Sequence, residues 1–171
     1  MKTFEKTIER PTWNDEMLEE LSENFAQKIL KWSKTQDEQD WWTYKECLDA
    51  CRKVFEYSFV DDNGYQLAKE FENEGFMPNL EFVDILDGVS SEVYQIKQKH
   101  IKKWVEMNDI QLNFKKGQKV IAKIRAKGEI ECEIMDEYPE KAQYVVWFEG
   151  LGYIRGKGGR IINQEDIIKV V

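Results

Sequence analysis

The stretch KVIAKIRAKGEIECEI, residues 119–134, decides the fold of the C-terminal part of the chain, because its side chains alternate with a period of two. Apolar residues at every second position alternate mainly with Lys and Glu, as in strands that bury one face. Gly128 lies between the two alternating runs and permits a tight turn. The stretch therefore predicts a β-hairpin, and its inward positions are Val120, Ala122, Ile124, Ile130, Cys132 and Ile134.

Further strand and turn signals continue to the end of the chain. A Tyr-Pro pair at 138–139 breaks the chain before the apolar run 144–148, glycines punctuate 150–159, and 167–171 reads as a final strand. Short strands separated by frequent turns predict a barrel or a sandwich. The order of these elements resembles that of SH3-like barrels of the Tudor and KOW type, over about a third of the chain. The resemblance implies an SH3-like β-barrel for residues 113–171.

The residues before this part show the spacing of amphipathic helices. The clearest helix spans 14–33, where Asn14 can cap the N-terminus and the apolar residues fall on one face at spacings of three and four. Further helices are predicted over 40–59, 65–74, 80–86 and from a cap at Ser90 or Ser91 to Met107. We therefore expect an α+β protein, with a bundle of about five helices in residues 1–112 and the barrel in 113–171.

The formal net charge of −8 is unevenly divided. Residues 1–112 hold 14 Lys and Arg against 24 Asp and Glu, a charge of −10, whereas residues 113–171 hold 11 against 9, a charge of +2. An acidic helical part favours a basic partner. The acidity is densest on the first helix, opposite its apolar face, and the residues predicted to bind that partner are Asp15, Glu16, Glu19, Glu20 and Glu23.

Basic residues in the C-terminal part suggest an alternative partner. The Lys residues of the strand 119–124 are predicted to face Glu129, Glu131 and Glu133 of the next strand, which neutralises them. Other residues remain free to contact phosphates, with an aromatic ring to stack on a base. They are Lys115, Lys116, Tyr153, Arg155, Lys157 and Arg160. The alternative function is therefore a nucleic-acid-binding accessory protein that uses the basic hairpin of the barrel.

The sequence contains no recognisable catalytic or metal-binding pattern. His100 is the single histidine, and no Ser or Cys has the local context of a nucleophile. Cys47 and Cys51 lie four residues apart on a predicted helix, a spacing unlike that of zinc ligands on turns. Cys51 continues an apolar stripe, as a buried free cysteine does. We expect no enzymatic activity, no metal and no cofactor.

The composition places the chain among small soluble proteins. No run approaches the ~20 apolar residues of a membrane span, and the N-terminal residues lack the apolar core of a signal peptide. Three cysteines do not form a disulfide framework, so we expect a cytoplasmic protein. Its size, acidity and richness in Lys, Glu, Ile and Asn look like those of a phage or mobile-element protein. These features predict a non-enzymatic protein-interaction module, most concretely a phage-type inhibitor such as an anti-CRISPR or other anti-defence protein, which docks its acidic helical surface on a basic, nucleic-acid-binding protein.

Overall fold

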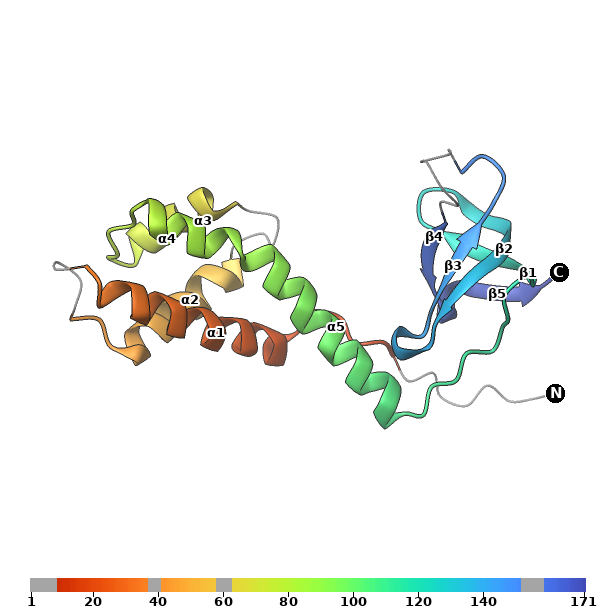
Figure 1. Ribbon diagram of the computed structural model, residues 1–171, viewed down its shortest axis with the longest axis horizontal. Coiled ribbons are helices and arrows are strands. Elements are labelled where there is room, and N and C mark those ends of the chain that lie inside the picture. Colours follow the sequence, from red (N-terminus) through yellow and green to blue (C-terminus); the bar gives the residue numbers. More distant parts are fainter. Residues whose placement is uncertain (1–8, 37–40, 58–62, 152–158) are drawn as a thin grey trace. The chain divides into compact units, whose positions relative to one another are not determined.

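The computed structural model describes residues 9–36, 41–57, 63–151 and 159–171, and it has a mixed α+β fold in which helices precede an antiparallel sheet (Figure 1). No helix in these residues is both long and apolar enough to cross a membrane.

The chain divides into two compact units. The helical unit is Pro11–His100, and the β unit comprises residues 9–10 together with Ile101–Val171. The boundary falls inside the last helix, α5 (Val89–Met107), so this helix contributes residues to both units. Each unit has its own hydrophobic core.

The helical unit is built from amphipathic helices. They are α1 (Asp15–Ser33), α2 (Tyr44–Tyr57), α3 (Gly64–Asn73), α4 (Leu80–Asp87) and the first part of α5. The predicted start of α1 is confirmed, because the Asn14 side chain accepts a hydrogen bond of 3.1 Å from the amide of Met17. Phe71 lies at the centre of the core, where its ring meets those of Phe55, Phe76 and Phe82 at centroid distances of 6.1, 5.5 and 5.3 Å.

Two helix starts differ from the prediction by more than one residue. α2 begins at Tyr44, not at residue 40, because Thr43 and Glu46 form a capping box: the Thr43 amide donates to the Glu46 carboxylate at 2.9 Å, and the Glu46 amide donates to the Thr43 hydroxyl at 3.3 Å. α5 begins at Val89. Its first turn already contains Ser90 and Ser91, so the prediction that one of these serines caps the helix is wrong.

The β unit contains an open five-stranded antiparallel sheet with the order β4-β3-β2-β1-β5. Its strands are β1 (Lys119–Ile124), β2 (Gly128–Tyr138), β3 (Gln143–Trp147), β4 (Arg160–Asn163) and β5 (Ile167–Val170). A 3-10 turn, η2 (Gln164–Asp166), joins the two edge strands. The predicted inward positions of the first hairpin are buried, except that Ile130 is only partly buried.

The predicted alignment of a Lys row with a Glu row across the first hairpin is confirmed by the strand register. Lys119 lies opposite Glu133 and Lys123 opposite Glu129 in the register of β1 and β2. The Lys119 ammonium lies 3.3 Å from the carboxylate of Glu131, on the same face of the sheet. This basic row therefore faces an acidic row within the sheet.

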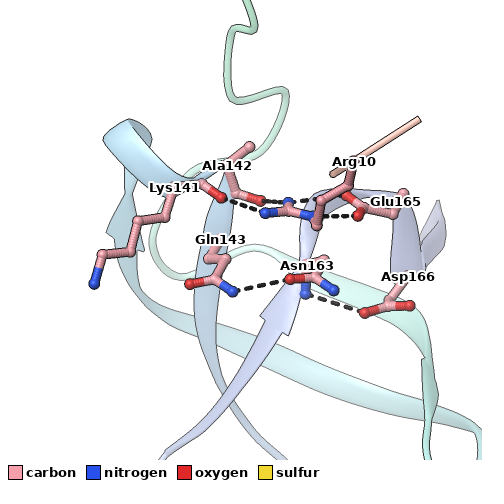
Figure 2. A network of polar contacts seen from close by, with 7 residues as sticks. All are labelled: Arg10, Lys141, Ala142, Gln143, Asn163, Glu165 and Asp166. Atoms are coloured by element: carbon pink, nitrogen blue, oxygen red, sulfur yellow. Dashed lines mark hydrogen bonds and ion pairs between the residues drawn. The ribbon is translucent and has the colours of Figure 1, made fainter. Parts of the chain in front are cut away.

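Arg10 joins the β unit from a position far away in the sequence (Figure 2). Its guanidinium donates to the backbone carbonyls of Lys141 and Ala142, both at 2.8 Å, and forms a two-point ion pair with Glu165 in η2. The guanidinium also lies over the Trp104 ring, 5.1 Å from its centroid. Arg10 thus connects to η2 and to the turn that precedes β3.

Candidate partner-binding surfaces

The predicted acidic face of α1 is partly used for contacts inside the helical unit. Glu19 binds the guanidinium of Arg52, which also contacts Asp49 at 3.2 Å. The hydrogen bond from Arg52 lowers the pKa of Glu19. Glu19 therefore connects α1 to α2, and its charge is compensated.

Glu20 points toward a different neighbour, α5. Its two carboxylate oxygens lie 2.7 Å from the Lys99 ammonium and 3.1 Å from Nε2 of His100. Partial burial works against the ionised form, but the hydrogen bonds from Lys99 and His100 outweigh it and lower the pKa of Glu20. His100, the single histidine, therefore contacts α1 within the helical unit.

Replacing Glu20 by Gln should destabilise the helical unit by about 1 kcal/mol at neutral pH. A carboxylate whose pKa is lowered in the folded state contributes its stability above the unfolded value, near 4.5, and loses it as the pH falls through the folded value. The difference between wild type and Glu20→Gln should therefore shrink when the pH is lowered from neutral to about 3. Urea denaturation followed by circular dichroism at both pH values measures it. Glu23→Gln, at an exposed position of the same helix, should show no such difference, and an unchanged deficit at pH 3 would contradict the ion-pair account.

Three of the five acidic residues remain exposed to solvent: Asp15, Glu16 and Glu23. In the part of the chain that the structure describes, none of the three forms an ion pair. The carboxylate row is thus divided into two residues that connect helices and three that are available to a partner.

An aromatic stack lies on the helical unit, and the sequence did not point to it. The Trp41 ring stacks on Trp42 at a centroid distance of 4.7 Å, and Trp42 stacks on Phe76 at 3.9 Å with the rings 9° apart. Phe76 is 3% exposed and Trp41 is 61% exposed, so the stack leads from the core to the surface. The sequence TYKE at 43–46 could have indicated this arrangement. Thr43 and Glu46 form a capping box, so α2 begins at Tyr44 and both tryptophans lie before the helix.

The predicted nucleic-acid contacts are only partly placed. Tyr153, Arg155 and Lys157 lie outside the described residues. The Lys115 ammonium lies 3.8 Å from the Glu137 carboxylate. Lys116 is exposed, and Arg160 is half-buried in β4.

The cysteines occupy core positions. Cys47 and Cys51 are buried in the helical unit and Cys132 in the sheet. Burial raises the pKa of the Cys47 thiol to about 11 and also raises those of the other two thiols. No group of three or more His, Cys, Asp or Glu side chains within residues 9–36, 41–57, 63–151 and 159–171 is arranged to hold a metal ion.

Comparisons with family models, curated proteins and solved structures found no match for this chain.

Proposed function

We propose that this protein is a non-enzymatic interaction module whose helical unit binds a basic, nucleic-acid-binding protein. The observation that carries the proposal is the combination of strong negative charge with an exposed aromatic stack. Residues 11–100 hold nine Lys and Arg against 20 Asp and Glu, a formal charge of −11. Such a charge attracts basic surfaces and repels nucleic acid.

The aromatic stack adds apolar contact area, which charge alone does not provide. Trp and Tyr carry much of the binding energy at protein interfaces, because they bury a large area at little cost in side-chain entropy. Trp41 stands 61% exposed on a rigid support of Trp42 and Phe76. The exposed part of the Trp41 side chain offers a partner apolar area to bury. The most concrete form of the proposal is a phage-type inhibitor, such as an anti-CRISPR or other anti-defence protein, that occupies the nucleic-acid groove of its target.

We also infer that the sheet is an SH3-like barrel of the Tudor and KOW type. The strand order β4-β3-β2-β1-β5, with β4 and β5 joined by the 3-10 turn η2, supports it. The core on one face of the sheet, formed by side chains from β1 to β4, is consistent with a strongly curved sheet. The closing of such a barrel would bring the edge strands together.

The alternative, a nucleic-acid-binding accessory protein, has less support. Of its basic residues, Lys115 precedes β1 and Arg160 begins β4, in a sheet whose exposed Trp147 lies among three glutamates. Those carboxylates would repel the phosphates that accompany any base stacked on the indole. The nucleic-acid titration described in the Discussion distinguishes the two functions.

Reversal of the exposed carboxylates should weaken partner binding by about tenfold or more. The variant is Asp15→Lys, Glu16→Lys and Glu23→Lys together. Glu19 and Glu20 are left unchanged because their ion pairs stabilise the bundle. Tagged wild type and variant are used to capture proteins from cells. The basic nucleic-acid-binding protein recovered with the wild type is then purified, and its affinity for each form is measured by calorimetry.

A matched control distinguishes the effect of where the carboxylates lie from the effect of the protein's net charge. Glu56, Glu70 and Glu72 are exposed on α2 and α3, so reversing all three to Lys changes the net charge by the same amount. The control should bind within about threefold of the wild type. Equal losses in both triple variants would show that only net charge matters, and would contradict an interface on α1.

A further inference from the structure

A pocket of about 310 Å³ opens on the sheet, and two residues of the sheet's core, Cys132 and Phe148, contribute to its lining. Its walls include Lys119 at the start of β1, Glu131 and Glu133 of β2, Trp147 at the end of β3 and the following Glu149. The strand register places Lys119 opposite Glu133 and Glu133 opposite Trp147, so these three side chains form a row across the sheet. The pocket is therefore built on paired strands, which hold its walls in place.

The pocket presents an aromatic face beside uncompensated negative charge. The Trp147 side chain is 42% exposed. Lys119 neutralises one carboxylate, since its ammonium lies 3.3 Å from Glu131. Glu133 and Glu149 form no ion pair with any residue that the structure describes. The three carboxylates and one ammonium leave a formal charge of −2.

We propose that this pocket binds an arginine side chain of a protein partner. A guanidinium is planar, so it can stack on the indole while its N–H groups donate to two carboxylates at once. The lysine ammonium is compact and strongly hydrated, and it lacks the flat face that the indole requires. The site is independent of the function proposed for the helical unit, because it uses residues of the β unit alone.

The probe for this site is the short peptide acetyl-Gly-Arg-Gly-amide. Two-dimensional NMR of the ¹⁵N-labelled protein follows the indole N–H of Trp147, which is assigned by its disappearance in Trp147→Leu. The indole signal should shift in a saturable manner, with a dissociation constant of about a millimolar for a single side chain. The peptide in which neutral citrulline replaces arginine should bind at least tenfold more weakly, and the lysine peptide should also bind more weakly than the arginine peptide.

Variants test each wall. Glu133→Gln keeps the shape of the pocket and should weaken binding about fivefold. Glu129→Gln is its matched control, since Glu129 lies on the same strand face but outside the pocket, and it should bind as the wild type does. Lys119→Ala should strengthen binding several-fold, because it frees Glu131 for the ligand.

Three results would overturn the proposal. One is an indole signal that stays in place at tens of millimolar arginine peptide. Another is equal binding of the arginine and citrulline peptides, which would make charge irrelevant. The third is weaker binding to Lys119→Ala, which would show that the lysine is part of the recognition and not a competitor.

Discussion

Replacing Ile134 by Asp is expected to unfold the β unit. Ile134 is fully buried in β2, opposite Val146 of β3 and within the core of the sheet. The substitution removes a large apolar side chain and places a carboxylate where no cation can reach it, so the expected loss is about 5 kcal/mol or more. Near-UV circular dichroism and the dispersion of the amide signals of β1 to β3 in NMR spectra measure it.

Ile161→Asp is the control for this prediction. Ile161 lies in β4 of the same sheet but is 56% exposed, so the new carboxylate stays in water. Its free energy of unfolding should lie within about 1 kcal/mol of the wild-type value. A folded Ile134→Asp protein with wild-type stability would contradict the assignment of the inward face of β2.

The second large effect is expected for Arg10→Ala. The substitution removes two hydrogen bonds to the carbonyls of Lys141 and Ala142, as well as the ion pair with Glu165 (Figure 2). The Arg10 side chain is only 13% exposed, so the two carbonyls would lose partners that water replaces poorly. We expect a loss of about 3 kcal/mol in the stability of the β unit, measured by urea denaturation with NMR signals from β3 and β4.

Glu165→Gln separates the parts of this network. The variant keeps both carbonyl contacts of Arg10 and removes only the charge of its ion-pair partner, whose side chain is 42% exposed. Its loss should be about 1 kcal/mol or less. If Arg10→Ala lost no more than Glu165→Gln, the hydrogen bonds to Lys141 and Ala142 would not contribute to stability.

The first hairpin was predictable because its signals are local. Strict alternation fixes which side chains face the core, and Gly128 fixes where the chain turns. The alternation alone therefore predicted that a Lys row faces a Glu row in any antiparallel register. The register itself, with Lys119 opposite Glu133 and Lys123 opposite Glu129, comes from the structure. Asn14 was equally readable as a cap, since a cap acts on the three residues that follow it.

Other features depend on contacts between distant residues. Helical periodicity placed Glu19 and Glu20 on the surface of α1, but it could not show that Arg52 of α2 and Lys99 of α5 reach them. Arg10 and Glu165 are separated by 155 positions, and no local pattern connects them. Such pairs follow from the packing of whole elements, which a one-dimensional pattern does not encode.

The candidate pocket was half predictable. The alternation placed Glu131 and Glu133 on the outer face of the hairpin, which the structure confirms. The register of β3 decides that Trp147 lies beside Glu133, and the break at Tyr138-Pro139 leaves that register open in the sequence. The sequence alone therefore did not show that Trp147 lies beside Glu131, Glu133 and Glu149.

The most direct test of the central claim, that this protein binds a protein partner and not nucleic acid, is a fluorescence-anisotropy titration. Wild-type protein is added to labelled single-stranded and double-stranded DNA and RNA at several salt concentrations. The acidic helical unit predicts no saturable binding at physiological ionic strength. Saturable binding that weakens with salt, that is lost in the triple variant Arg155→Ala, Lys157→Ala and Arg160→Ala, and that is unaffected by the reversal of Asp15, Glu16 and Glu23 would contradict the account and support the accessory function.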